Sequence, residues 1–112
     1  FHSSLMKPAA EKLRMALSDV VLAVPQIPVL NNVDVAVQQD ADAIRDALYR
    51  QAFGAVRWVE CVQALKGRGI THIIECGPGK VLAGLTKRID PELVGAALFD
   101  PATLAETREL LA

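Results

Sequence analysis

His2 is a candidate for proton transfer, although composition alone does not single it out, and two serines follow it directly. A histidine can serve as the base for a serine nucleophile when the two side chains face each other. Ser3 and Ser4 cannot turn back onto His2 at the start of a helix, and no GxSxG nucleophile elbow occurs in the chain. If His2 is a general base, its nucleophile lies outside these 112 residues. The alternative is an ordinary solvated histidine.

The cysteines and the second histidine contain atoms that could bind a metal ion. These residues are Cys61, His72 and Cys76, but no zinc-ligand spacing links them and no fourth ligand is evident. We therefore expect no metal site, a structural role for His72, and two cysteines that act as small buried hydrophobic residues. Two cysteines outside any CxxC pair also favour a reducing compartment.

The acidic residues do not form a paired-carboxylate site, because Asp34, Asp46, Glu60 and Glu75 fall on different expected elements. Glu75 is the best placed, since it follows a strand at the end where open α/β sheets bind ligands. We favour the simpler interpretation that its carboxylate caps the loop or helix that follows.

A glycine turn with the sequence Gly-Pro-Gly-Lys occupies positions 77–80. A phosphate-binding loop would need GxxxxGK followed by Ser or Thr, whereas Val81 follows Lys80 and the first glycine is missing. The turn is therefore interpreted as a tight connection that lets a helix pack closely on the preceding strand.

Three basic side chains, Lys80, Lys87 and Arg88, recur at a helical spacing after this turn. Positions i, i+7 and i+8 fall on one face of a helix. This face is either simply solvated or a docking patch for an acidic partner.

Hydrophobic periodicity and turn residues divide the chain into alternating elements. Helices are expected over residues 3–17, from the N-cap Asp40 to positions 51–54, over 56–66, over 80–89, and from Asp100-Pro101 to Leu111; strands are expected over 27–30, 70–75 and 94–98, with Asn31-Asn32 as a break. The order αβααβαβα predicts an α/β fold with a thin parallel sheet of three strands.

Composition limits the kind of protein. The chain is 52% hydrophobic, with 13 acidic and 12 basic residues and a net charge of −1. Such a balance excludes a general nucleic-acid binder, and no apolar run approaches the roughly 18 residues of a membrane span. The length corresponds to one domain at most.

Three segments in the right order resemble the C-terminal third of bacterial malonyl-CoA:acyl carrier protein transacylases. They read FHSSLMKPAA from Phe1, PVLNNVD from Pro28 and ECGPGKVL from Glu75, and DALYRQ with VRW between the last two adds to the likeness. The resemblance covers nearly the whole chain. It implies that residues 1–112 are the C-terminal portion of the large subdomain of an α/β-hydrolase-like acyltransferase core, without the ferredoxin-like subdomain, and that the chain is a fragment of a longer enzyme.

The resemblance also implies the chemistry of a ping-pong acyl transfer. A serine attacks the malonyl thioester of coenzyme A, and the phosphopantetheine thiol of acyl carrier protein then attacks the acyl-serine. His2 takes the place of the histidine base, and Gln51 matches the residue whose main-chain carbonyl holds that histidine, so its side chain is expected to be replaceable with modest effect. Phe1 is compatible with malonyl as the acyl group.

Further expectations follow from the same resemblance. The partners are acyl carrier protein, received in part by Lys87 and Arg88, a coenzyme A thioester and the missing N-terminal part of the enzyme. No cofactor or metal is expected, the location is cytoplasmic and the pathway is fatty acid biosynthesis. The serine elbow and the arginine for the malonyl carboxylate precede this segment, so the isolated chain should be inactive. A stand-alone α/β module that binds an acidic carrier protein and a structural remnant remain the alternatives.

Overall fold

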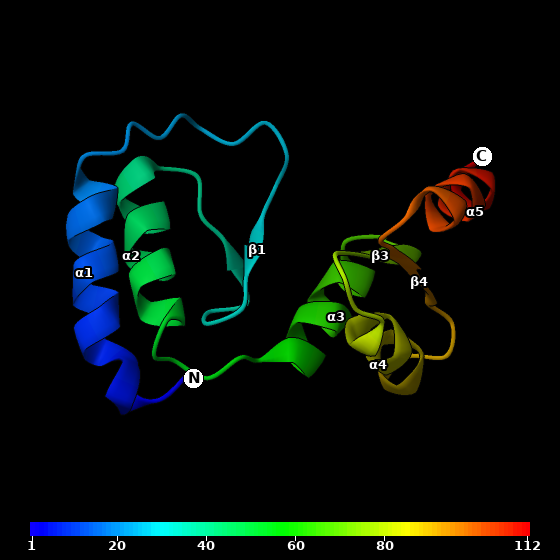
Figure 1. Cartoon of the computed structure of the whole chain (residues 1–112), viewed down its shortest axis with the longest axis horizontal. Coiled ribbons are helices and arrows are strands. Elements are labelled where there is room, and N and C mark those ends of the chain that lie inside the picture. The colour runs from blue at the N-terminus through cyan, green and yellow to red at the C-terminus, as the bar shows by residue number, and fades with distance from the viewer. The chain divides into compact units, whose positions relative to one another are not determined.

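The computed structural model describes residues 1–112, which form two compact units, Phe1–Cys61 and Val62–Ala112. Each unit is considered by itself, with the elements labelled in Figure 1. Helix α3 (Trp58–Gly67) begins in unit 1 and ends in unit 2. The assignment of residues 1–112 to one portion of a larger subdomain stays a prediction. None of the helices combines the length and apolar character that crossing a bilayer requires.

Unit 1 contains two helices that lie side by side (Figure 1). A short 3-10 helix (Ser4–Met6) leads into α1 (Lys7–Ser18), and α2 (Ala41–Gln51) starts after Asp40, whose side chain accepts a hydrogen bond from the Ala43 amide at 2.9 Å. Ala10 of α1 and Ala47 of α2 are buried. Small side chains at these positions let the two helices approach closely.

The predicted strand at 27–30 shares only Leu30 with the observed strand, and the predicted break at Asn31-Asn32 is right for Asn32 but wrong for Asn31. Strand β1 is Leu30–Asn31, and it pairs antiparallel with β2 (Ala36–Val37), which the periodicity did not reveal. The Asn31 side chain explains the hairpin, because it donates to the Ala36 carbonyl at 2.9 Å and accepts from the Asp34 amide at 2.8 Å. Asparagine here stabilises a turn from within a strand rather than ending it.

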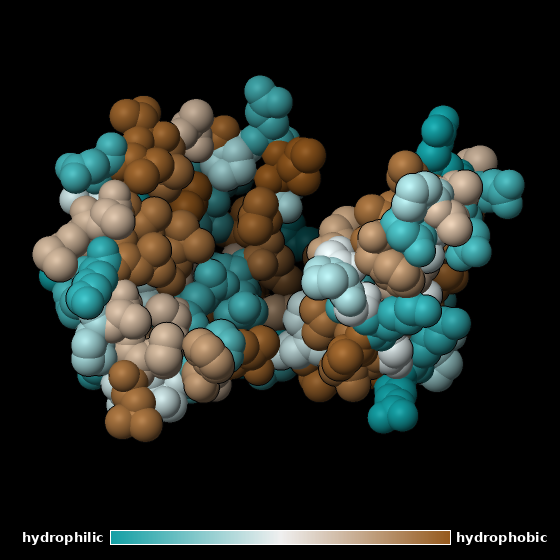
Figure 2. Space-filling model, in the orientation of Figure 1, coloured by the Kyte–Doolittle hydropathy of each residue, from teal (hydrophilic) through white to brown (hydrophobic).

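Residues 19–29 contain no regular element and leave apolar side chains on the surface of unit 1. Figure 2 shows apolar atoms on the visible face of this unit. Exposed apolar residues of the segment include Val21, Val24 and Ile27.

Unit 2 is a two-stranded parallel sheet with helices. Strands β3 (His72–Cys76) and β4 (Val94–Leu98) pair in parallel from His72 opposite Val94 to Cys76 opposite Leu98. The α/β class is confirmed, but the expected third parallel strand is wrong, since β1 pairs only with β2.

The helices of unit 2 match the sequence pattern closely. Helix α4 (Val81–Ile89) connects the two strands, and α5 (Pro101–Leu111) follows β4. Asp100 caps α5 by accepting from the Thr103 amide at 2.7 Å, with Pro101 in the first turn. The carboxylate of Glu75 accepts from the Ala83 amide at 2.9 Å, which confirms its predicted capping role.

Candidate functional site

His2 is exposed and precedes Ser3, the N-cap residue of the 3-10 helix Ser4–Met6. Its backbone has φ 56°, a left-handed conformation that histidine adopts more readily than most residues. The ring atom Nδ1 lies 3.1 Å from the main-chain oxygen of Gln51. Because a carbonyl can only accept a hydrogen bond, Nδ1 must carry a proton, and in the neutral ring the lone pair is then on Nε2.

The carbonyl of Gln51 is available because it belongs to the last residue of α2. The carbonyls at a helix end have no partner within the helix. The Arg50 carbonyl accepts from the Gly54 amide at 2.8 Å, whereas the Gln51 carbonyl accepts from His2. The helix dipole places partial negative charge at this end.

The side chain of Gln51 has a partner of its own. Its Oε1 accepts a hydrogen bond from the Asn32 amide at 2.8 Å, in the turn between β1 and β2. The Asn32 carbonyl accepts in turn from the Arg57 amide at 3.0 Å. The sequence did not indicate the Gln51–Asn32 bond, since glutamine at a helix end has no fixed partner.

Arg50, next to Gln51, is held by the same turn. Its two terminal nitrogens donate to the two carboxylate oxygens of Asp34 at 2.6 and 2.7 Å, and its Nε donates to Asp46 at 2.7 Å. The guanidinium of Arg50 lowers the pKa of the Asp34 carboxyl, and the two carboxylates raise the pKa of Arg50. Both members of the Asp34–Arg50 pair are about one-third exposed at the side chain, so the pair is only partly screened by solvent.

Two further polar atoms near this turn are buried without a hydrogen-bond partner. They are Oδ1 of Asn32 and Nε1 of Trp58. Asn32 bonds to Gln51, and Asp34 bonds to Arg50 beside it, so Asn32, Asp34 and Arg50 are site residues that spacing alone missed. The signal available was that they stand within or beside the segments that resemble the acyltransferase family.

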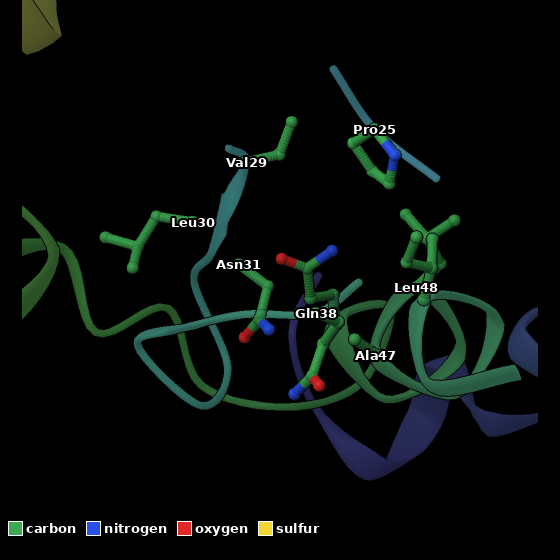
Figure 3. A pocket seen from close by; sticks show the side chains of 9 residues that line it. Pro25, Val29, Leu30, Asn31, Gln38, Ala47 and Leu48 are labelled. Atoms are coloured by element: carbon green, nitrogen blue, oxygen red, sulfur yellow. The ribbon is translucent and has the colours of Figure 1, made fainter. Parts of the chain in front are cut away.

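A hollow of about 170 Å³ lies on another side of Gln51. Figure 3 shows its labelled wall, in which Pro25, Val29, Leu30 and Leu48 are apolar and Asn31 and Gln38 carry amides. His2 does not line this hollow, so the hollow is separate from the reactive nitrogen.

The predicted docking residues are all in unit 2. Lys87 and Arg88 lie exposed in the last turn of α4, and neither forms an ion pair. Lys80 precedes the other end of the helix, and its ammonium lies 5.0 Å from the centre of the Phe99 ring. The structure therefore keeps Lys87 and Arg88 together and separates Lys80 from them along the helix.

The cysteines and His72 do not form a reactive cluster. No group of three His, Cys, Asp or Glu side chains is arranged to hold a metal ion, and both thiols are free. Cys61 is buried, which raises the pKa of its thiol, but Cys76 is exposed, so its predicted burial is wrong because it ends β3 at the surface. His72 Nδ1 lies 2.8 Å from the Thr71 hydroxyl.

No protein-family model matches the chain, but curated relatives do. The malonyl CoA-acyl carrier protein transacylase of Salmonella typhimurium is 50% identical over 104 residues, which cover 93% of this chain and 34% of the relative. The transacylase of Escherichia coli K12 is 48% identical over 109 residues, with coverage of 97% and 35%. The chain thus spans about a third of the length of the curated relatives it matches.

Solved structures give the same result. An acyl-carrier-protein S-malonyltransferase from Burkholderia pseudomallei 1710b is 64% identical with a TM-score of 0.91, covering 97% of this chain and 36% of that chain. A malonyl-transacylase in complex with a type II PKS acyl-carrier protein is 49% identical with a TM-score of 0.91, covering 97% and 35%.

Proposed function

Because this chain is a homologue of the C-terminal third of the malonyl-CoA acyl carrier protein transacylases, we propose that it supplies the general base of their acyl-transfer reaction. The substrates are malonyl-CoA and phosphopantetheinyl acyl carrier protein, and the product enters fatty acid biosynthesis. The observation that carries the proposal is the contact of His2 Nδ1 with the Gln51 carbonyl at 3.1 Å, since it leaves Nε2 free to accept a proton.

In the first half-reaction, Nε2 of His2 takes the hydroxyl proton of a serine as the serine oxygen attacks the malonyl thioester carbonyl. The tetrahedral intermediate collapses, the carbon–sulfur bond breaks, and Nε2–H gives its proton to the leaving coenzyme A thiolate. In the second half-reaction Nε2 takes the proton of the phosphopantetheine thiol, which attacks the acyl-serine, and the proton returns to the serine oxygen. Protons and acyl group balance without a cofactor.

The Gln51 carbonyl holds the ring throughout this cycle. It fixes the Nδ1–H tautomer and stabilises the imidazolium that forms, although a neutral carbonyl stabilises it less than a carboxylate would. No serine of the chain stands in a GxSxG elbow. We therefore assign the nucleophile to the part of the relatives that this chain does not span. The 112-residue chain alone is expected to be inactive.

The experiment that tests this proposal joins the chain to a nucleophile-bearing partner. The corresponding third of the Burkholderia pseudomallei malonyltransferase, which is 64% identical, is replaced by this chain, and transfer of malonyl from coenzyme A to acyl carrier protein is measured. His2→Ala should lower the rate by roughly 10²–10⁴-fold. His72→Ala is the matched control. A loss below tenfold for His2→Ala, or an equal loss for both variants, would contradict the assignment.

We assign Lys87 and Arg88 to reception of the carrier protein, because they are exposed and free of internal ion pairs. In the same chimera, reversing both charges should raise KM for acyl carrier protein with little change for malonyl-CoA. Arg108→Glu, at an exposed position of α5, is the control. If instead the 112-residue chain alone binds acyl carrier protein and His2→Ala has no effect in the chimera, the binding-module alternative is the better description.

A further inference from the structure

We propose that the turn between β1 and β2, residues 31–36, is the positioning element for the His2–Gln51 contact, acting through Asp34 on Arg50 and through Asn32 on the Gln51 side chain. The catalytic meaning of this inference depends on the proposed function, but the positioning itself does not. It also revises the expectation that the Gln51 side chain can be replaced with modest effect.

The first hold on the carbonyl is the Asp34–Arg50 pair. Both terminal nitrogens of the guanidinium donate to both oxygens of one carboxylate, at 2.6 and 2.7 Å. Such a two-point contact fixes orientation as well as distance. Asp34 is sixteen residues away from Arg50, so the pair joins the last turn of α2 to a separate loop rather than bracing the helix internally.

The second contact that holds the carbonyl is made by the side chain of Gln51 itself. Gln51 Oε1 accepts from the Asn32 amide at 2.8 Å, while its main-chain oxygen faces His2. Helix ends fray unless tertiary contacts hold them. With Arg50 and Gln51 both bound to one turn, the peptide groups on either side of the Gln51 α-carbon are held against rotation.

The turn itself is rigid enough for this task. Val35 has φ 56°, a strained conformation for a β-branched residue, which persists only where surrounding contacts enforce it. The two bonds of the Asn31 side chain span the turn. Gly54 permits the turn to approach the end of α2 closely, since a Cβ at position 54 would lie 2.9 Å from Val33 Cγ2 and 2.8 Å from the Arg50 main-chain oxygen.

The geometry therefore predicts which nitrogen of the His2 ring carries the proton, both with the carbonyl held and with it released. While the carbonyl is held, the neutral ring keeps its proton on Nδ1. When either hold is removed, the carbonyl swings, and the ring returns to the mixture of tautomers that free imidazole shows in water. The ratio of the two tautomers should then change by about fivefold, the worth of one hydrogen bond.

The test is nitrogen-15 NMR of the whole 112-residue chain, in which long-range proton–nitrogen couplings give the tautomer of His2. Gln51→Met keeps the length of the side chain but removes the acceptor, and should shift the ratio. Gln51→Glu keeps an acceptor oxygen, and should restore it. The signals of His72, whose partner is Thr71, are the internal reference.

A second pair of variants tests the ion pair. Asp34→Ala should shift the ratio of His2 tautomers, whereas Asp46→Ala should not. The Asp46→Ala substitution also removes a carboxylate partner of Arg50, but Asp46 lies on the same helix, four residues away, and does not join that helix to the turn. Circular dichroism confirms that each variant is folded. Should Asp34→Ala unfold the chain, Arg50→Lys, which keeps the charge and loses the two-point contact, replaces it.

An unchanged His2 tautomer in folded Gln51→Met and Asp34→Ala overturns the inference, and so does an equal shift in Asp46→Ala. The NMR signal reports the ring and not turnover, so this failure is distinct from failure of the transfer assay. In an active chimera, Gln51→Met should also lower kcat by roughly tenfold with KM for malonyl-CoA unchanged; a change in KM alone counts against a positioning role.

Discussion

Unit 1 and unit 2 are stabilised by different kinds of contact. In unit 1, long polar side chains of α2 bind residues that are distant in sequence, in α1 and just after it. Arg45 donates to the carbonyls of Leu17 and Val20 at 3.0 and 2.6 Å, and Tyr49 donates to Glu11 at 2.6 Å. In unit 2, a parallel ladder runs along the full length of two five-residue strands, and a helix lies directly on it.

The difference suits the role proposed for each unit. A backbone ladder depends little on any one side chain, whereas a loop held by a few polar groups can orient one carbonyl and responds to a single substitution. We expect the stability of unit 2 to be most sensitive to substitutions that crowd the backbone. We expect unit 1 to be most sensitive to substitutions that remove polar contacts with the turn at 31–36.

The largest effect should come from Gly95→Ala in β4. A Cβ at this position would lie 2.6 Å from the Ala83 main-chain oxygen and 3.2 Å from Thr86 Cβ, so the whole of α4 would have to move. We expect a loss of about 2–3 kcal/mol in the free energy of opening of the β3 and β4 amides, measured by hydrogen exchange.

The control for this substitution is Gly84→Ala in α4, where an added Cβ meets no atom within 4 Å. Alanine is favoured over glycine within a helix, so this variant should gain about 0.5–1 kcal/mol. If Gly84→Ala is as damaging as Gly95→Ala, close packing of α4 on β4 is not the feature that stabilises unit 2.

A smaller effect is expected for Gly54→Ala in unit 1. One of its two close neighbours is the methyl group of Val33, at 2.9 Å, which can move; the other is the Arg50 oxygen at 2.8 Å. We expect a loss of about 1–2 kcal/mol in the opening free energy of the α2 amides. The His2 tautomer should change in the same variant. Lost stability with an unchanged tautomer would separate Gly54 from the positioning of the carbonyl.

The same division explains how far the sequence predicts the fold. In unit 2 the strand at 94–98 and the helix after Asp100 are confirmed to the residue, because β-branched and small apolar runs, glycine turns and N-caps are local signals. In unit 1 the hairpin was missed. Two-residue strands carry no periodicity, and Asn31 acts through bonds to Ala36 and Asp34 that a pattern does not reveal.

The candidate site divides in the same way. The proximity of His2 and Gln51 was implied by resemblance and not by spacing, since 49 residues separate them. Asp34 was interpreted as one of several scattered carboxylates. Its pairing with Arg50 depends on how the turn returns to α2, which is a property of the tertiary structure alone.

The smallest expected effect is the loss of folding stability at low pH. The Arg50 guanidinium lowers the pKa of Asp34 below its ordinary value of 3.8, and the Lys66 ammonium does the same for Asp90 in unit 2. A carboxylate with a lowered pKa in the folded state contributes stability that is fully present above its ordinary pKa and is lost as the pH falls through the folded value. Both pairs are partly exposed to solvent, which keeps each contribution small.

Trp58 and Tyr49 both belong to unit 1, so fluorescence in a urea titration reports this unit. At neutral pH Asp34→Asn should be less stable than the original chain by this probe. The difference should begin to shrink as the pH falls below about 4 and should vanish below the lowered pKa of Asp34, where the folded carboxylate of the original chain is also neutralised. Asp90→Asn should leave the fluorescence midpoint of unit 1 unchanged. A difference for Asp34→Asn that persists at low pH would mean that its carboxylate stabilises the turn by shape rather than by charge.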